Sequence, residues 1–292
     1  MLATTEWLSA HLGDPDLVIV DLRWREDGSG RIEYERSHIP GAVFLDWTTD
    51  LVDPSNPVAF MLAGPERFAA TMERSGIGDA AGVVAYSDGL GSGPHRLWWA
   101  CAVYGHDIVR VLDGGFDAWV REGRPVQRGA SSPRHPVEPF TPAFEPTLVA
   151  GIGDVEAAAG DPRTVILDSR PPVQYRGDAV WFETGPIPAG PDGVARTPRG
   201  RIRAGRVPWA RNVPAASLYH DDATLKTPEE LREVFAQAGV RPGSRAVTYC
   251  GVGISASALT FALRLAGIED VALYDASWEE WGRDPRRPVA RG

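Results

Sequence analysis

Cys250, one of two cysteines in this chain, stands between an apolar run and two glycines in the stretch YCGVGISA. The residues before it, Arg245–Tyr249, are typical of a buried β-strand, and those after Ser255 follow a helical pattern. Cys250 is therefore expected at a strand-to-helix turn, at the carboxyl edge of a parallel sheet. Ligands of α/β proteins bind at that edge.

The turn after Cys250 has the composition of an anion-binding loop. Gly251 and Gly253 can adopt backbone angles closed to other residues, so the loop can curl around one point. Its N–H groups would then converge on the sulfur, and the positive end of the following helix would reinforce them. This setting favours a nucleophilic thiolate and equally stabilises a persulfide anion. The alternative is a small core residue, which is how we interpret Cys101 in the apolar helical run RLWWACAVYG.

Two other motifs compete for the same loop. Gly251–Ala256 fits the dinucleotide-binding pattern G-x-G-x-x-A, with Glu269 and Asp270 near the expected acidic position. Too few residues follow Asp270 for the βαβ array that this motif normally opens. A Cys-x5-Arg phosphatase loop would need arginine where Ala256 stands. Because no zinc-ligand spacing and no phosphate-binding GK[ST] occur, we expect neither a metal nor a cofactor.

The strands and turns that must position the loop occur in two similar copies along the sequence. DLVIVDLRW and RTVILDSRP both end in Asp-x-Arg, and AAGVVAYSDG matches SRAVTYCGVG. VRVLDGGFDAW likewise matches VALYDASWEEW. In this alignment Ser87 stands opposite Cys250, so the second copy alone carries a nucleophilic sulfur.

Within each copy, short apolar strands alternate with helical patterns, which predicts an α/β fold with a parallel sheet and helices on both faces. We expect two similar domains at residues 1–127 and 147–292, joined by a Pro/Ser-rich linker at 128–146. The first domain would be catalytically silent. The second contains an extra segment rich in Gly, Pro and Arg at residues 176–205.

Bulk composition limits the classes of function. The chain has 292 residues, 43% hydrophobic and 24% charged, as soluble globular proteins do. A net charge of -9 argues against non-specific nucleic-acid binding, and no apolar run approaches the roughly 20 residues that span a bilayer. The start lacks the features of a signal peptide, and two cysteines suggest a reducing compartment. We therefore expect a cytoplasmic protein that binds neither nucleic acid nor membrane.

With these motifs the sequence resembles the tandem-domain rhodanese-type sulfurtransferases, which use thiosulfate or 3-mercaptopyruvate. The resemblance rests on the paired Asp-x-Arg motifs, SHIPGA at residues 37–42, the loop CGVGIS and SWEEW near the end. It implies two rhodanese-like domains with a substrate cleft between them. It also implies a ping-pong reaction in which Cys250 takes a sulfane sulfur from a small anionic donor.

In this family the resulting persulfide passes its sulfur to cyanide, a thiol or a protein acceptor. The resemblance assigns the active-site loop, whose N–H groups act like an oxyanion hole, to Gly251, Val252, Gly253, Ile254 and Ser255. A non-catalytic persulfide carrier, or a rhodanese-like protein that binds a partner, is the alternative function.

Substrate-binding positions depart from the family's patterns. The third loop residue is Ser in mercaptopyruvate enzymes and Lys in thiosulfate enzymes, but here it is Val252. The family's substrate-holding Arg falls on Gln174, and Arg176 is the expected substitute. Other arginines that could join it in holding an anionic donor are Arg196, Arg199, Arg201 and Arg203. A donor with one carboxylate needs less compensating charge than thiosulfate, which favours 3-mercaptopyruvate.

The histidine of HIPGA, His38, is expected to be structural rather than a proton relay. In the second copy Arg206 replaces it.

Overall fold

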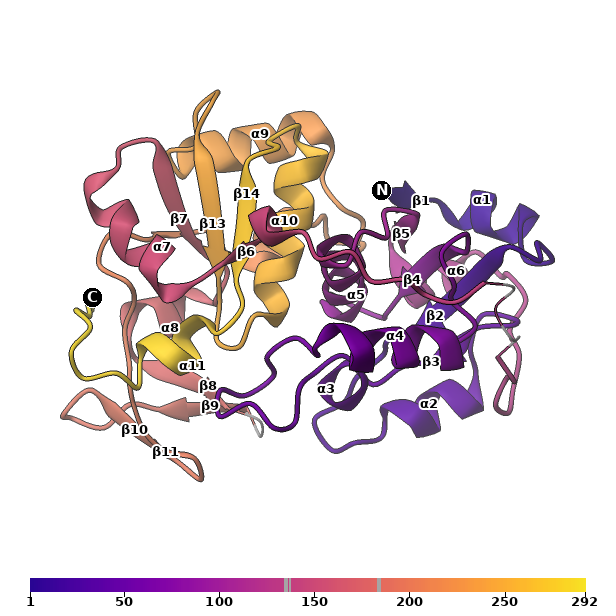
Figure 1. Cartoon of the computed structure of the whole chain (residues 1–292), viewed down its shortest axis with the longest axis horizontal. Helices are drawn as coiled ribbons and strands as arrows, with labels where there is room; N and C mark the ends of the chain where they lie inside the picture. Colours follow the sequence, from indigo (N-terminus) through magenta and orange to yellow (C-terminus); the bar gives the residue numbers. More distant parts are fainter. Residues whose placement is uncertain (134–135, 137, 183–184) are drawn as a thin grey trace. The chain divides into compact units, whose positions relative to one another are not determined.

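The chain folds into two compact units in the computed structural model, which describes residues 1–133, 136, 138–182 and 185–292 (Figure 1). Unit 1 comprises Met1–Pro54, Leu62–Pro146 and Tyr219–Leu225. Unit 2 comprises Ser55–Met61, Thr147–Leu218 and Lys226–Gly292. Each unit therefore includes a short segment from the other half of the sequence, so no single cut reproduces either unit. The boundaries at residues 127 and 147 remain a prediction.

Unit 1 is built on a five-stranded parallel sheet flanked by helices. In spatial order the strands are β1 (Leu2–Ala3), β5 (Val109–Leu112), β4 (Gly82–Tyr86), β2 (Leu17–Asp21) and β3 (Val43–Phe44). The helices are α1 (Thr5–Ala10), α2 (Gly30–Arg36), α3 (Trp47–Asp50), α4 (Pro65–Arg74), α5 (Gly93–Val103) and α6 (Gly115–Arg121).

Unit 2 repeats this arrangement. Its parallel sheet runs β12 (Arg211–Asn212), β7 (Thr164–Asp168), β13 (Arg245–Tyr249), β14 (Val271–Tyr274) and β6 (Val149–Ala150). Its helices are α7 (Ile152–Ala157), α8 (Pro172–Arg176), α9 (Pro228–Gln237), α10 (Ile254–Leu265) and α11 (Ser277–Trp281), with short 3-10 turns at Pro146–Leu148, Ala158–Gly160 and Ala215–Leu218. The predicted fold class, two similar α/β domains, is confirmed.

The extra segment of the second copy contains two antiparallel hairpins. These are β8–β9 (Ala179–Phe182, Gly185–Pro188) and β10–β11 (Val194–Thr197, Gly200–Arg203). The second hairpin buries Ala195 and Ile202, which lie directly opposite each other, and leaves Arg196 and Arg201 exposed. Alternation of side chains across the hairpin therefore points these two arginines away from the core.

Each Asp-x-Arg motif is a buried ion pair at the carboxyl end of a central strand. Arg170 Nη2 lies 2.6 Å from Asp168 Oδ2, and both side chains are at most 2% exposed. Arg23 and Asp21 form the same pair at 2.7 Å in unit 1. Tyr86, on the neighbouring strand, donates a 2.6 Å hydrogen bond to Asp21. Losing one partner would leave an uncompensated buried charge, which explains why both copies retain the motif.

His38 is fully buried and contacts the predicted linker segment at residues 128–146. Its Nδ1 lies 2.8 Å from the Tyr34 carbonyl oxygen, so Nδ1–H donates there. Nε2 can then accept from the Ser131 hydroxyl at 3.1 Å. Ser131 belongs to the predicted linker, whose described residues fall in unit 1. These contacts support a structural role for His38.

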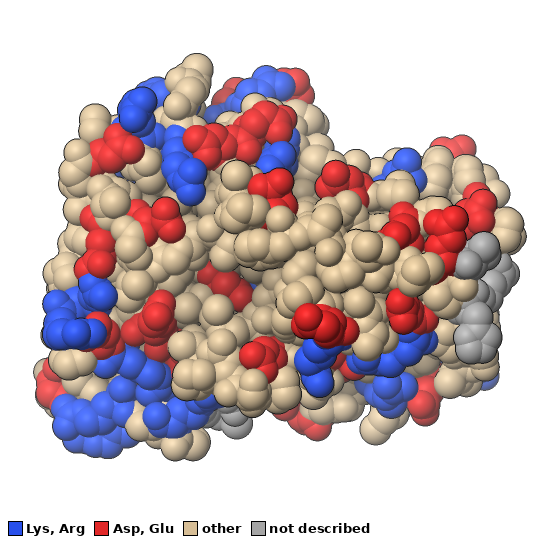
Figure 2. Space-filling view, viewed as in Figure 1, with Lys and Arg blue, Asp and Glu red and all other residues tan. Residues whose placement is uncertain are grey.

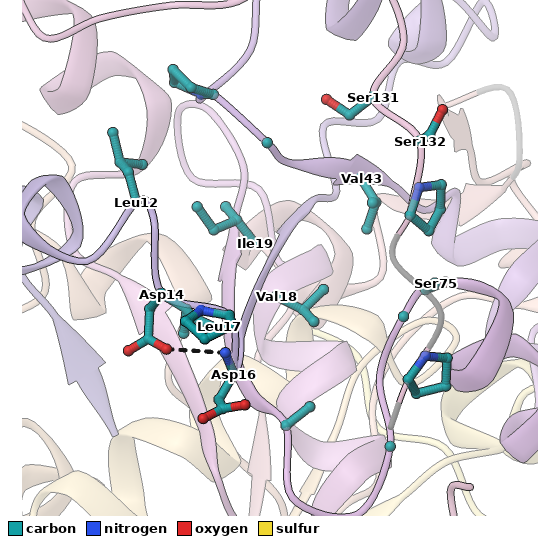
Figure 3. Close-up of a pocket in the computed structure, with 18 of the residues that line it drawn as sticks. Leu12, Asp14, Asp16, Leu17, Val18, Ile19, Val43, Ser75, Ser131 and Ser132 are labelled. Atoms are coloured by element: carbon teal, nitrogen blue, oxygen red, sulfur yellow. Dashed lines mark hydrogen bonds between the residues drawn. The ribbon is translucent and has the colours of Figure 1, made fainter. Parts of the chain in front are cut away.

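A cavity of about 640 Å³ lies in unit 1 at the amino ends of its strands (Figure 3). Figure 3 shows acidic and apolar side chains facing three serines across it: Asp14, Asp16 and Leu17 on one side, Ser75, Ser131 and Ser132 on the other. Ligands of parallel α/β sheets bind at the carboxyl edge, and this cavity lies at the opposite edge. In the described part of the chain, no helix has the length and apolarity needed to cross a membrane.

Three buried histidines of unit 1 predict acid sensitivity. Burial lowers the pKa of His38 and His106, and lowers that of His95 to about 3. Below pH ~6.5 these imidazoles bind protons in the unfolded chain but not in the folded chain. The free energy of unfolding therefore decreases as the pH is lowered. For His95 this amounts to about 1.4 kcal/mol per pH unit, continuing towards pH 3.

In the variant His95→Gln, the free energy of unfolding should depend less steeply on pH, by about 1.4 kcal/mol per pH unit, which is the contribution of one proton. Urea unfolding at several pH values between about 5 and 7 measures it. An unchanged slope would contradict the assignment.

Candidate active site

Cys250 occupies the predicted strand-to-helix turn. It directly follows β13 and is 3% exposed, and α10 begins four residues later at Ile254. Gly253 precedes that helix with a φ of 80°, a left-handed conformation that favours glycine. The sulfur therefore stands at the carboxyl edge of the sheet, next to the positive end of a helix of 12 residues.

The start of α11 clamps the backbone of Cys250. The Cys250 N–H donates to Ser277 Oγ at 3.1 Å, and the Trp278 N–H donates to the Cys250 carbonyl at 3.0 Å. The Glu279 N–H donates to the Gly251 carbonyl at 2.9 Å. Because the amide of Cys250 itself is used here, the N–H groups that can converge on its sulfur are those that follow it.

Apolar burial and one hydroxyl contact hold the rest of the loop. Val252 and Ile254 are 7% and 8% exposed. Ser255 Oγ lies 2.8 Å from the hydroxyl of Ser169, which follows β7. The structure thus encloses the predicted loop between the ends of β7, β13 and α11.

A guanidinium group contacts the side chain of Glu279, the residue whose backbone N–H holds this loop. Arg199, in the turn between β10 and β11, has its Nε 3.7 Å from Glu279 Oε1, and Arg283 Nε lies 2.8 Å from the same oxygen. Glu279 is 5% exposed, and its own N–H holds Gly251. In the sequence Arg199 is one of several similar arginines. Its position in the turn of the β10–β11 hairpin, within contact of Glu279, is what distinguishes it.

The two predicted substrate-binding residues lie on α8. Arg176 is 51% exposed at the end of this helix, with its Nε 3.2 Å from Asp178. Gln174 is 5% exposed, and its buried Oε1 has no hydrogen-bond partner among the residues that the structure describes.

The other arginines of the extra segment divide into two kinds. Arg203 donates hydrogen bonds to four backbone carbonyl groups, those of Trp281, Gly282, Asp284 and Arg287, and is structural. Arg196 and Arg201 are exposed on the hairpin. Figure 2 shows basic side chains gathered over β10–β11 and the nearby C-terminal residues.

The matching loop of unit 1 is filled differently. The Phe116 N–H donates to the Ser87 carbonyl at 2.8 Å, as Trp278 does to Cys250, which confirms that Ser87 and Cys250 correspond. In this loop, however, Asp117 accepts the Gly89 N–H at 2.7 Å. A carboxylate thus already occupies a loop N–H group, and it would repel an anionic donor.

Comparisons with known proteins agree with this geometry. The rhodanese-like domain matches residues 4–122 and again residues 152–284. The chain belongs to the rhodanese family. Among its relatives, 3-mercaptopyruvate sulfurtransferase of Escherichia coli is 33% identical over 97% of this chain and 95% of the relative. The sulfur carrier protein TtuD of Thermus thermophilus is 32% identical, over 100% of this chain and 97% of the TtuD chain.

A solved rhodanese-fold structure, that of SseA from Escherichia coli, matches with a TM-score of 0.80 and 31% identity. It covers 95% of this chain and 98% of the SseA chain.

The two cysteines should respond oppositely to substitution. Cys250→Ser is expected to abolish sulfur transfer without unfolding the protein, because it removes the nucleophile at nearly constant volume. Cys101→Ser should retain most activity, since Cys101 is fully buried in α5, where burial raises the pKa of its thiol. Intact-mass and peptide measurements after incubation with donor will show which cysteine gains a sulfur. An extra sulfur on Cys101 would reject the assignment.

A cysteine placed in the unit 1 loop should not create a second site. In Ser87→Cys the new thiol would precede Asp88, whose charge is paired by Arg25, and would share its loop with the Asp117 carboxylate, which opposes a thiolate. We expect one sulfur per chain after incubation with donor, on Cys250. Two sulfurs per chain would contradict the model of one active site.

Proposed function

We propose that the protein transfers a sulfane sulfur from a small anionic donor to a thiophilic acceptor through a persulfide on Cys250. One observation carries this proposal. The cysteine of a rhodanese-family chain sits in a glycine loop at the start of α10, and α11 clamps its backbone. The acceptor would be cyanide, a low-molecular-weight thiol or a protein thiol.

The first half-reaction forms a sulfur–sulfur bond. The Cys250 thiolate attacks the donor's terminal sulfur, and the bond between that sulfur and the rest of the donor breaks. The electron pair leaves with sulfite when the donor is thiosulfate. It leaves with the enolate of pyruvate, which then takes a proton, when the donor is 3-mercaptopyruvate. The loop N–H groups stabilise the charge that remains on the outer sulfur.

The second half-reaction restores the thiolate. The acceptor attacks the outer sulfur of the persulfide, and the electron pair of the broken bond returns to Cys250. With cyanide the product is thiocyanate. No change in net oxidation state is required over the cycle, so the chemistry needs no separate oxidant or reductant.

The composition of the site favours a donor with one carboxylate. Val252 supplies no charge, and Gln174 offers an amide where the family has an arginine. Arg199 and Arg176 are the two guanidinium groups that we propose for the donor's carboxylate. Both guanidinium groups already have partners: Arg199 contacts Glu279 and donates to the Pro57 carbonyl at 3.0 Å, and Arg176 pairs with Asp178. Arg199 differs in that its partner Glu279 also holds the loop through its backbone N–H. We therefore propose 3-mercaptopyruvate as the preferred donor, with Arg199 as its main anchor.

A second candidate function is that of a persulfide carrier which loads slowly and delivers to one protein. The similarity to a Thermus protein named as a sulfur carrier favours it. A carrier would acquire one sulfur on Cys250 yet show no steady-state turnover with small donors and cyanide. An enzyme shows both.

The ratio of kcat/KM for 3-mercaptopyruvate to that for thiosulfate, in the unmodified protein, tests the donor assignment. We expect this ratio to exceed one. Val252→Lys should lower the ratio, because the added ammonium compensates the second charge of thiosulfate. A clear preference of the unmodified protein for thiosulfate would reverse the donor assignment but leave Cys250 as the sulfur carrier.

A matched pair of variants locates the anchor. Charge-assisted hydrogen bonds contribute about 1.5–3 kcal/mol each, so Arg199→Ala should lower kcat/KM tenfold or more. Arg176→Ala should lower it less. Equal losses would show that both arginines hold the donor, and an effect at Arg176 alone would remove Arg199 from the site.

A further inference from the structure

The residue that binds the Cys250 amide has an unusual backbone. Ser277 has a φ of 51°, and it is one of three non-glycine residues with positive φ in the described ranges, beside Phe60 and Ala223. Its side chain is fully buried. A left-handed backbone is unfavourable for a residue with a Cβ atom, so the conformation needs compensation from its surroundings.

The hydroxyl of Ser277 is oriented by two contacts. It donates its only proton to the Tyr274 carbonyl at 2.8 Å, at the end of β14. The oxygen therefore presents a lone pair to the Cys250 N–H, 3.1 Å away. One hydroxyl thus bridges the end of β14 and the first residue of the loop after β13.

The duplicated unit provides an internal comparison. Gly115 occupies the matching position, with a φ of 56°, and the residue after it makes the same bond to the loop. A Cβ atom on Gly115 would lie 2.3 Å from the Ser87 carbonyl oxygen, so no side chain fits there. The matched position is thus left-handed in both units, as a glycine in unit 1 and as a serine in the unit that contains the cysteine. The residue before it differs, because Gly114 is also left-handed whereas Ala276 is right-handed.

We propose that Ser277 is a positioning residue for sulfur transfer, an inference that rests on the function proposed for Cys250. Its hydroxyl fixes the peptide plane before Cys250, so that the N–H groups after it point towards the sulfur. The carbonyl group of this peptide, that of Tyr249, accepts the Ser169 N–H at 3.0 Å. Without the hydroxyl, the peptide is therefore held on one side only, and the N–H groups after it are directed less firmly towards the sulfur. The unfavourable backbone of Ser277 is retained because glycine would lack the hydroxyl.

The informative variant is Ser277→Gly, which tolerates the left-handed turn, reproduces Gly115 and removes the hydroxyl. We expect kcat with 3-mercaptopyruvate and cyanide to fall about tenfold, as for the loss of one hydrogen bond to a buried donor. KM should change less, because the arginines that hold the donor are untouched. The midpoint of thermal unfolding should change little, since relief of the backbone offsets the lost contacts.

Two further variants separate positioning from stability. Ser277→Ala also lacks the hydroxyl but keeps the unfavourable Cβ, so it should lose a similar factor in kcat and unfold at a lower temperature than Ser277→Gly. Ala223→Gly relieves the same kind of backbone in unit 1 and should keep the native kcat. A native kcat in Ser277→Gly would overturn the proposal. So would a kcat that falls only in proportion to the fraction unfolded.

The rate of Cys250 alkylation by iodoacetamide, measured at one fixed pH by peptide mass, does not depend on turnover. Ser277→Gly should slow it about tenfold, because the loop no longer stabilises the thiolate as well. An unchanged rate overturns the positioning role. Failure of the unmodified protein to form a persulfide would instead refute the proposed function, and this assay would still judge Ser277.

Discussion

The buried pair of Asp168 and Arg170 is the interaction on which the candidate site depends. Arg170 lies 2.6 Å from Asp168, donates to the Gly205 carbonyl at 2.8 Å and stacks 4.6 Å from the centre of the Trp278 ring. Burial alone would lower the pKa of Arg170, but the Asp168 carboxylate outweighs it and raises this pKa. One charged group thus joins the end of β7 to α11, the helix that clamps Cys250.

The same framework serves both units, so it does not by itself account for the activity that we propose for unit 2 alone. In unit 1, Arg23 pairs with Asp21 and lies 4.1 Å from the centre of the Phe116 ring, as Arg170 lies over Trp278. What differs is the loop and the short helix beside it. Asp117 turns its carboxylate to a loop N–H in unit 1, whereas two arginines hold Glu279 in unit 2. A carboxylate that accepts a loop N–H repels an anion approaching the same loop.

Local charge, rather than net charge, governs this site. The chain carries a net charge of -9, yet the loop that we propose to stabilise a persulfide lies at a helix amino end, and Arg199 contacts the Glu279 side chain next to it in sequence at the start of α11. Salt screens interactions between exposed charges over about 8–10 Å, so exposed acidic residues far from the loop contribute little there. The turn of the β10–β11 hairpin, and not its exposed arginine face, brings a guanidinium group to Glu279.

The sequence by itself determined the duplicated α/β fold and the turn at Cys250, and it predicts that the unit with Ser87 is catalytically silent. The spacing of apolar residues, the composition of the strands and the placement of glycines are local properties that can be read from the sequence. Because the two copies show the same pattern, each supports the prediction made for the other. It pointed to Arg176, two residues beyond the family position, but could not single out Arg199 from Arg196, Arg201 and Arg203. The hairpin register decides which of these side chains reaches Glu279. The left-handed backbone of Ser277 and the exchanged segments of the two units also arise only in tertiary structure, because they depend on contacts between residues far apart in sequence.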